Sequence, residues 1–241
     1  MAIQPVSIPV GSEKMAGLLY VPDHKEDKKF PSVVIFHGRG SSKKRYQDRA
    51  QALAEKGFLT LVFDFRGCGE SDGNFSEQTI AMGFEDAAAG YDFLKNNPLC
   101  DQNRVGVLGG SFGGYQAALL SGKYPIKSLI LAAPAIYQDE WWDIVPETMS
   151  PERKGLYRQQ GGFDETKSME TIVKYPGQIL IIEHEKDEII PQRVTEAYYK
   201  NALSAKSKER NVIPDAPHAL HDQKYLVQSI KLVTEWFTKT L

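Results

Sequence analysis

From about residue 30 onward, short apolar runs alternate along the chain with segments whose apolar residues recur at helical spacing. Strands buried on both faces are almost continuously apolar, and parallel strands need crossover connections that are usually helices. The alternation therefore predicts an α/β fold, a mostly parallel sheet with helices on both faces. The predicted parallel strands are residues 32–37, 58–63, 104–108, 128–132, 178–183 and 209–213.

Two further strands and a set of helices complete the expected pattern. Residues 3–10 and 14–21 flank Gly11-Ser12, which predicts an antiparallel hairpin at the start of a sheet of about eight strands. In the clearest helix, apolar residues recur at steps of three and four from Ile80 to Leu94, before a stop at Asn96-Asn97-Pro98. Other helices are expected at 46–56, 112–123, 192–203 and around 226–237.

Composition narrows the class of protein. With 241 residues, 41% hydrophobic and 25% charged, the chain suits a single α/β domain, residues 1–241, and not a disordered or coiled-coil protein. A formal net charge of -2 offers no basic excess for nucleic-acid binding. No apolar stretch reaches the roughly 18 residues of a membrane span, and the first residues do not resemble a signal peptide. We therefore expect no nucleic-acid or membrane partner, and a cytoplasmic location.

The residues that most often bind metals do not form a recognisable set. Cys68 and Cys100 are too few for a disulfide framework or a thiolate zinc site, so we expect reduced thiols. His37 ends a predicted strand, and a single histidine there is more often a hydrogen-bonded structural residue than a ligand. We predict no metal and no cofactor.

Residues 134–176 interrupt the alternation. The interval contains no clear strand and is dense in aromatic residues, among them Tyr137, Trp141 and Trp142. A structureless loop of about forty residues is uncommon inside a domain, so we expect a cap or lid inserted in the single domain. We expect its aromatic rings to bind an apolar acyl or aryl part of a substrate. Rings that only pack the cap onto the body would give the same pattern.

The most informative motif is a G-x-S-x-G formed by Gly109, Ser111 and Gly113. It lies directly after a predicted strand and before a predicted helix. A serine on such a turn has a strained backbone that exposes its hydroxyl above the strand end, and small neighbours let the strand and helix approach. The helix N-terminus directs its amides to the same place. This context predicts that Ser111 is a nucleophile.

A serine nucleophile needs a base, and the base needs an orienting carboxylate. On strand–turn–helix serine motifs these follow in the order serine, acid, histidine. We predict His218, in the loop before the last helix, as the base in preference to His221. We predict Asp187 as the acid because it follows an apolar strand, although Glu185 and Glu188 lie in the same loop and are expected to be solvated.

The oxyanion that forms when a serine attacks a carbonyl needs two backbone donors. One is expected from the amide of Phe112, the residue after the nucleophile, and the other from the loop after the third strand. In that loop, His37-Gly38-Arg39-Gly40, the amide of Arg39 is the predicted donor.

Five ordered motifs resemble those of the α/β-hydrolase superfamily, over nearly the whole chain. Within it the chain looks most like small cinnamoyl and feruloyl esterases and dienelactone hydrolases, and its serine motif is also similar to that of prolyl oligopeptidase-type peptidases. Glu185, Asp215 and Pro217 stand where these esterases usually have glycine. The five motifs are 37–40, 63–73, 109–114, Asp187 with Ile190-Pro191, and His218.

The resemblance implies an α/β-hydrolase fold and a serine hydrolase that cleaves a small-molecule carboxylic ester through an acyl-enzyme. The alternatives are a peptidase or amidase, an acyl thioesterase, and a non-catalytic scaffold, which the complete triad disfavours. The basic run Lys43-Lys44-Arg45 could attract a carboxylate-bearing substrate or simply begin a helix at the surface. We expect a monomer or a homodimer.

Overall fold

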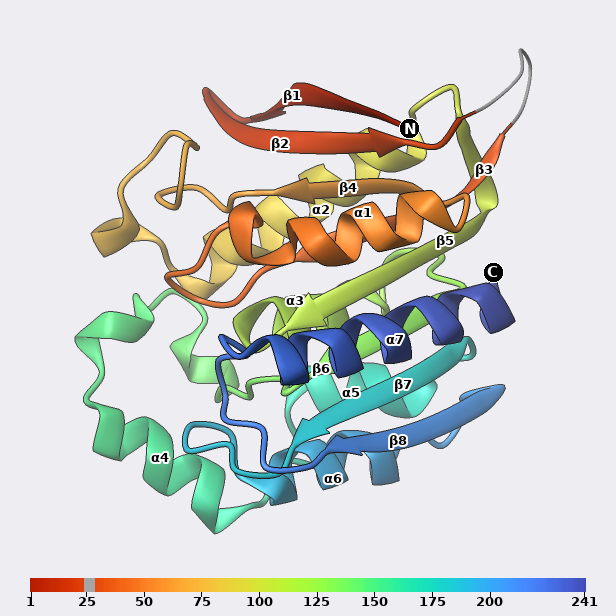
Figure 1. Ribbon diagram of the computed structural model, residues 1–241. Coiled ribbons are helices and arrows are strands. Elements are labelled where there is room, and N and C mark those ends of the chain that lie inside the picture. The colour runs from red at the N-terminus through yellow and green to blue at the C-terminus, as the bar shows by residue number, and fades with distance from the viewer. Residues whose placement is uncertain (24–28) are drawn as a thin grey trace.

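A central eight-stranded sheet organises the computed structural model, which describes residues 1–23 and 29–241 (Figure 1). The strand order is β1-β2-β4-β3-β5-β6-β7-β8. β2 runs antiparallel to both of its neighbours, and all other pairs are parallel. The strands are β1 (Ala2–Val10), β2 (Glu13–Val21), β3 (Phe30–Phe36), β4 (Leu59–Phe63), β5 (Cys100–Gly110), β6 (Ser128–Ala132), β7 (Gln178–His184) and β8 (Ser207–Ile213).

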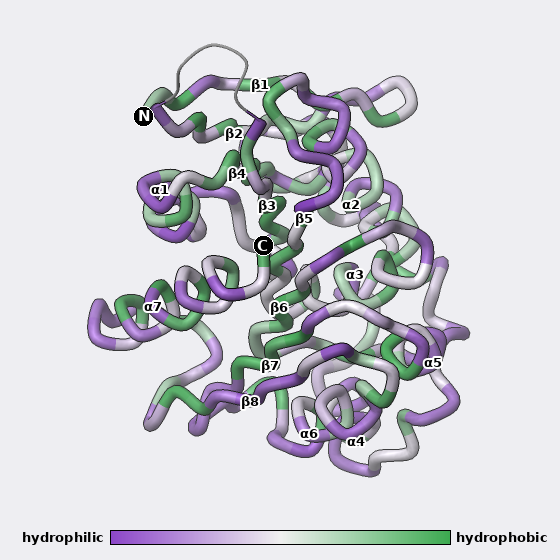
Figure 2. Tube along the Cα trace, turned by 90° about the vertical axis from the view of Figure 1, so that its right-hand side faces the viewer, coloured by the Kyte–Doolittle hydropathy of each residue, from purple (hydrophilic) through white to green (hydrophobic). Residues whose placement is uncertain are grey.

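Helices cover both faces of the sheet, as Figure 2 shows in an end-on view. One face carries α1 (Gln47–Glu55) and α7 (Gln223–Thr240), and the other carries α2 (Ile80–Lys95), α3 (Phe112–Leu120), α5 (Lys167–Lys174) and α6 (Gln192–Asn201). The middle strands are the most hydrophobic part of the trace because helices cover them on both sides. The predicted fold class, a mostly parallel sheet of about eight strands opened by a hairpin, is confirmed.

Local signals explain where several helices begin. The Thr79 side chain accepts a hydrogen bond from the Met82 amide at 3.2 Å and so caps α2, and Asp222 caps α7 through the Lys224 amide at 2.9 Å. The predicted helix over residues 112–123 ends earlier, at Leu120, where the chain turns toward β6.

The interval 134–176 contains two kinds of structure. Its first part holds two short 3₁₀ turns, at Asp139–Trp141 and Pro146–Thr148, and α4 (Pro151–Gln160). Its last part is α5, which packs against α3 and α6 in the layer that covers the sheet, with Met169 and Ile172 fully buried. α5 is thus the crossover helix between β6 and β7, and the inserted part is confined to residues 134–166. Because α5 is only two turns long, its sequence has too few apolar repeats for a helical period to be recognised.

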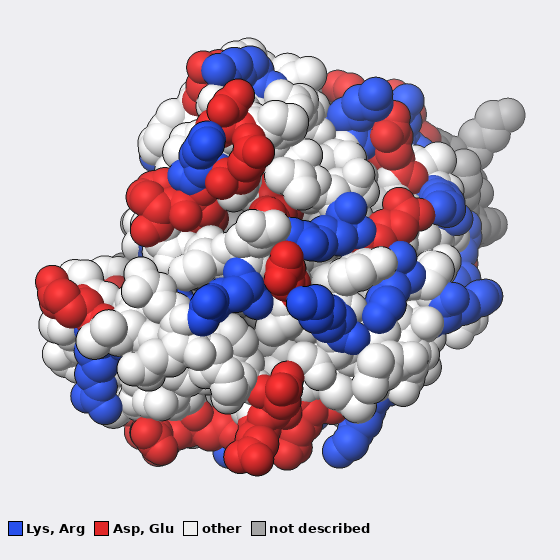
Figure 3. Space-filling view, turned by 90° about the horizontal axis from the view of Figure 1, so that it is seen from below, with Lys and Arg blue, Asp and Glu red and all other residues white. Residues whose placement is uncertain are grey.

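The edge of the sheet opposite β1 is strand β8, which carries charged side chains. Arg210 pairs with Glu183 at 2.7 Å, and Glu209 pairs with Lys239 at 2.6 Å. Charges on an edge strand discourage pairing with a second sheet. Figure 3, which views the molecule from below in Figure 1, shows basic and acidic side chains interspersed on that face. Among the described helices, none combines the length and the apolar character that a bilayer span requires.

Candidate active site

Ser111 lies on the sharp turn between β5 and α3, where the backbone is strained. Its φ of 51° and ψ of -115° lie where side-chain-bearing residues are rarely found. Hydrogen bonds hold the turn in place, because the Ser111 amide donates to Ala132 O at 2.9 Å and the Ser111 carbonyl accepts from the Ala135 amide at 2.9 Å. The turn therefore presents the hydroxyl at the carboxyl edge of the sheet, as the motif predicts.

The glycines beside Ser111 are required by close backbone contacts. A Cβ on Gly109 would lie 2.3 Å from Gly113 O, and a Cβ on Gly113 would lie 2.3 Å from Phe36 O. These atoms belong to the main chain of α3 and β3, so they cannot move aside without displacing the nucleophile turn.

We expect Gly113→Ala to lower the free energy of unfolding by at least about 2 kcal/mol, because the new methyl overlaps the β3 backbone. Gly155→Ala is the matched control. That glycine lies inside α4, and a Cβ added to it would meet no atom within 4 Å, so alanine should stabilise the protein by about 0.5–1 kcal/mol. Urea unfolding of both variants measures the difference, and equal effects would contradict the steric argument.

The structure brings Ser111, His218 and Asp187 into hydrogen-bonding contact, although they come from distant parts of the chain. Ser111 Oγ lies 3.0 Å from His218 Nε2, and His218 Nδ1 lies 2.7 Å from Asp187 Oδ2. Because a carboxylate only accepts, Nδ1 carries the proton and Nε2 is left to accept from the serine hydroxyl. The alternative base, His221, instead lies 2.5 Å from the Arg45 guanidinium through its Nδ1.

Asp187 is buried and held in one orientation. Its side chain is only 4% exposed, and its Oδ1 accepts hydrogen bonds from the amides of Ile189 and Ile190 at 2.9 and 2.8 Å. The second oxygen, Oδ2, is thereby directed at His218. Two amide donors and the imidazole satisfy a carboxylate that would otherwise be costly to bury.

The glutamates of the acid loop are exposed to solvent, as expected, and they also accept hydrogen bonds from the histidine loop. Glu188 Oε2 accepts from the His218 amide at 3.1 Å, and Glu185 Oε2 accepts from the Asp215 amide at 2.9 Å. Asp215 has a φ of 57°, a left-handed conformation that explains why glycine is usual there. Glu185 and Asp215, two of the three positions that differ from the resembling esterases, therefore contact each other and help to hold the loop that carries His218.

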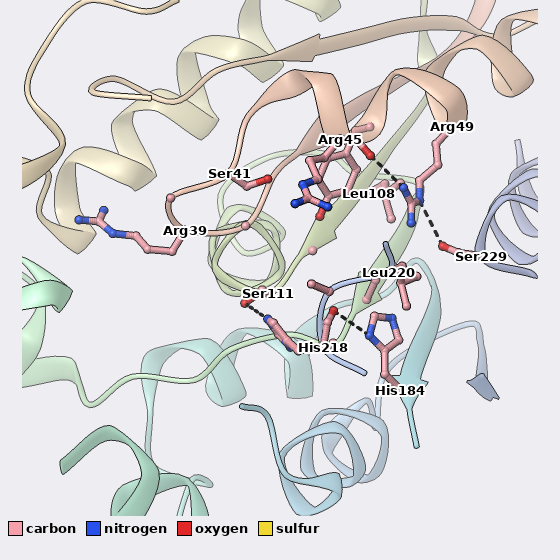
Figure 4. Close-up of a pocket in the computed structure, with 17 residues that line it drawn as sticks. Arg39, Ser41, Arg45, Arg49, Leu108, Ser111, His184, His218, Leu220 and Ser229 are labelled. Atoms are coloured by element: carbon pink, nitrogen blue, oxygen red, sulfur yellow. Dashed lines mark hydrogen bonds between the residues drawn. The ribbon is translucent and has the colours of Figure 1, made fainter. Parts of the chain in front are cut away.

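The two predicted oxyanion donors lie beside Ser111. Phe112 is the first residue of α3, so its amide has no acceptor within the helix. The loop from Gly38 to Ser41 lines the same cavity as Ser111, and a Cβ on Gly38 would lie 3.4 Å from the serine Cβ. The Arg39 side chain extends away from Ser111 (Figure 4) and leaves its backbone at the cavity.

The Arg39 guanidinium joins the oxyanion loop to the insertion. It contacts Glu147 of the insertion at 2.5 Å, and it donates to Gln78 Oε1 at 2.6 Å and to Gln78 O at 2.7 Å. It also lies over the Phe75 ring, 4.5 Å from the centroid. This side chain therefore positions the loop and is not available to a substrate.

His37 and Asp64 form hydrogen bonds that hold the loops next to the site. His37 donates from Nδ1 to Gly38 O at 2.7 Å and accepts from the Phe65 amide at Nε2, and burial lowers its pKa to about 4. Asp64 accepts from the Lys43 amide at 2.6 Å and pairs with the Lys43 ammonium at 2.5 Å. Across residues 1–23 and 29–241, no group of three or more His, Cys, Asp or Glu side chains is arranged to hold a metal ion.

The aromatic rings predicted to bind substrate do not line the cavity at Ser111. Tyr137 and Trp141 are 3% and 1% exposed, and Trp142 is half-buried against Phe84. Tyr137 makes an edge contact with Tyr115 of α3 at 5.0 Å between centroids. Tyr137 and Trp142 therefore pack the insertion onto the body, which is the second of the two interpretations that the sequence left open, whereas Trp141 packs against Tyr157 within the insertion, with 5.3 Å between the ring centroids. We do not include them in the site.

A cavity of about 280 Å³ opens beside Ser111 and His218 (Figure 4). Arg45 and Arg49, near the start of α1, face it from one side, and His184 faces it from the other. Neither His184 nor Arg49 was predicted from the sequence to belong to the site. The available signal for Arg49 was a charged residue one turn before Leu53 on the apolar face of a predicted helix.

Comparison with known proteins agrees with this architecture. Residues 27–159 match the family described as "Serine aminopeptidase, S33", and residues 97–234 match the uncharacterised protein family UPF0227. The chain is 28% identical over 215 residues to the protein Rv2307c of Mycobacterium tuberculosis, covering 88% of this chain and 72% of that protein.

Two solved structures show the same fold at lower identity. Est1E from Butyrivibrio proteoclasticus, solved with ferulic acid bound, has a TM-score of 0.76 at 21% identity and covers 98% of both chains. A dienelactone hydrolase from Anabaena variabilis has a TM-score of 0.69 at 20% identity and covers 100% of this chain and 98% of its own. The chain therefore has the α/β-hydrolase fold and belongs to the family described as serine aminopeptidase, S33, and also to UPF0227.

Proposed function

We propose that this hydrolase cleaves carboxylic esters with Ser111 as nucleophile, His218 as general base and Asp187 as the acid that orients it. The observation that carries the proposal is the continuous contact from Ser111 Oγ to His218 Nε2 at 3.0 Å and from His218 Nδ1 to Asp187 Oδ2 at 2.7 Å. A nucleophile and a base within hydrogen-bonding distance, with the base held by a third group, is the arrangement that acyl transfer needs.

In this mechanism Ser111 Oγ attacks the ester carbonyl carbon while His218 Nε2 takes the hydroxyl proton. The amides of Phe112 and Arg39 donate to the oxyanion of the tetrahedral intermediate. The carbon–oxygen bond to the alcohol then breaks, the imidazolium protonates the leaving alcohol, and an acyl-enzyme remains. His218 next deprotonates a water molecule, whose attack releases the acid and restores Ser111. Asp187 keeps the proton on Nδ1 throughout.

A second candidate function is an aminopeptidase, which the description of the matching family favours. An aminopeptidase must bind the ammonium group at the substrate's N-terminus. Within the described chain, no aspartate or glutamate lines the cavity beside Ser111, whereas Arg45 and Arg49 do. Cationic walls repel an ammonium group, so the electrostatics support ester hydrolysis over aminopeptidase activity.

Labelling and a substrate panel test the proposal. We expect a fluorophosphonate probe to label the wild type, and we expect turnover of short nitrophenyl acyl esters or methyl hydroxycinnamates. We expect no turnover of aminoacyl nitroanilides. Turnover of the nitroanilides without any ester hydrolysis would favour the peptidase, and absence of labelling would contradict a serine mechanism.

A further inference from the structure

The cavity beside Ser111 contains buried polar groups that the proposed mechanism does not use. Arg49 is 7% exposed, and its Nε donates to Ser229 Oγ at 3.1 Å while its Nη1 donates to Arg45 O at 3.1 Å. Both partners are uncharged. Burial lowers the pKa of the guanidinium, yet arginine remains a cation in proteins. The charge of Arg49 therefore lies in the protein without a carboxylate in contact with it.

In the part of the chain that the structure describes, no carboxylate forms an ion pair or a hydrogen bond with Arg49. Within residues 1–23 and 29–241, no aspartate or glutamate lines the cavity. Asp48 precedes Arg49 on α1 and acts on it through its charge alone, from an exposed position. Arg45 adds a second cation to the wall, where its guanidinium contacts the His221 ring. The Arg49 guanidinium also lies over the Tyr46 ring, 5.1 Å from its centroid. A buried cation without a carboxylate partner is still costly, and an anionic ligand would offset that cost.

His184 supplies a second unsatisfied polar atom on the opposite wall. Its Nδ1 donates to the His218 carbonyl at 3.1 Å, while its buried Nε2 has no hydrogen-bond partner within the described chain. Burial lowers the pKa of His184 to about 4, so the ring is neutral near pH 7. His184 and Arg49 line the same cavity. Neutral His184 can accept a hydrogen bond from a bound water or hydroxyl group.

The cavity joins these groups to the reacting serine. Ser111 and His218 line it together with Arg49 and His184 (Figure 4). The apolar side chains of Leu108 and Leu220 and the ring of Tyr46 line it as well. A ligand that reaches both Ser111 and Arg49 therefore has a carbonyl at one end, a short apolar spacer and an anionic group at the other. The volume of about 280 Å³ limits it to a small molecule.

We infer that this cavity is a carboxylate-binding subsite and that the substrates of the proposed esterase are short esters bearing a carboxylate, which Arg49 and Arg45 bind. The inference rests on the proposed function for its substrate class, but the anion site itself exists independently of hydrolysis. A guanidinium that is already held by Ser229 and by the Arg45 carbonyl loses little freedom on binding, which favours a planar carboxylate as its ligand.

A pair of esters with the same shape tests the subsite. Monomethyl succinate and methyl 4-methylpentanoate share one skeleton and differ by a terminal carboxylate in place of two methyl groups. We expect the wild type to hydrolyse the carboxylated ester with at least about tenfold higher kcat/KM. In Arg49→Gln the ratio of the two kcat/KM values should fall by about tenfold or more. In the control Arg104→Gln, whose arginine pairs with Asp101, the ratio should stay unchanged.

Binding of succinate gives a readout that does not depend on hydrolysis. At ten times its Kd, succinate should raise the melting temperature of the wild type and of Ser111→Ala by about 3 °C, whereas the uncharged succinamide should not. The shift should disappear in Arg49→Gln. If that variant fails to fold, Arg45→Gln, which changes a side chain that is not fully buried, should reduce both the ester ratio and the shift.

The outcomes separate the two proposals. Hydrolysis of both esters at similar kcat/KM, with no succinate shift, would overturn the carboxylate subsite and leave the esterase intact. Hydrolysis of neither ester, with a succinate shift that requires Arg49, would overturn the esterase and keep the anion site.

Discussion

Ser111→Ala is expected to lower kcat for ester hydrolysis by about 10⁴ to 10⁶, because the variant has no atom that can form the acyl-enzyme. The substitution should slow the chemical step without disturbing the fold. Alanine removes only the Oγ that contacts His218 Nε2 and leaves the hydrogen bonds of the Ser111 main chain, to Ala132 and Ala135, in place. Steady-state kinetics on the best ester of the panel, together with fluorophosphonate labelling, measures the loss.

A second serine in the same region provides the control. Ser121 ends α3, and its hydroxyl donates to Ala118 O at 2.7 Å, away from the cavity. Ser121→Ala should keep kcat within about twofold of the wild type, because it removes one backbone contact at a helix end. If Ser111→Ala retained ester hydrolysis comparable to Ser121→Ala, the proposed nucleophile would be wrong.

Asp187→Asn is expected to lower kcat by about 10⁴, an effect typical of an orienting carboxylate, with little change in stability. The reason lies in the contacts of the two carboxylate oxygens. The amides of Ile189 and Ile190 donate to Oδ1, so this position must keep an oxygen in the asparagine variant. The NH₂ group is then placed at the Oδ2 position, against His218 Nδ1. As a donor it forces Nδ1 to accept and moves the imidazole proton to Nε2.

A proton on Nε2 prevents His218 from accepting the proton of Ser111, which explains the expected loss. Asp222→Asn is the matched control, because Asp222 accepts from the Lys224 amide at the start of α7 and asparagine caps helices equally well. We expect its kcat to be unchanged. Proton NMR of the imidazole N–H can follow the tautomer directly. If Asp187→Asn kept more than about a tenth of the activity, the carboxylate would not be needed to orient the base.

The sheet and the serine turn were predictable from local sequence. Each expected strand exists. The central strands are covered on both faces and must be continuously apolar, a requirement that is visible within a few residues, whereas the hairpin of β1 and β2 was indicated by its turn at Gly11-Ser12. The strained turn at Ser111 was equally predictable from the local sequence. Gly109 and Gly113 occupy positions where a Cβ would strike backbone, and only glycine meets that demand.

The role of residues 134–176 was settled by tertiary packing and not by the sequence pattern. The aromatic pattern predicted a cap over all of residues 134–176, but α5 covers the sheet, and the ring of Tyr137 is buried against the body. Aromatic residues have the same one-dimensional pattern whether they face a ligand or a neighbouring helix. The contacts that distinguish the two are made with α3, far away in the chain.

Local patterns were sufficient to predict the layered α/β fold, the nucleophile turn and the order in which acid and base must follow. The folded arrangement was needed to establish that His218, and not His221, contacts Ser111 across 107 residues, and that Glu185 and Glu188 clamp the histidine loop. It was also needed to place the cation of Arg49 beside the same cavity. Burial and backbone strain leave a local pattern, whereas a hydrogen-bond or charge partner depends on which strands are neighbours and where their loops meet.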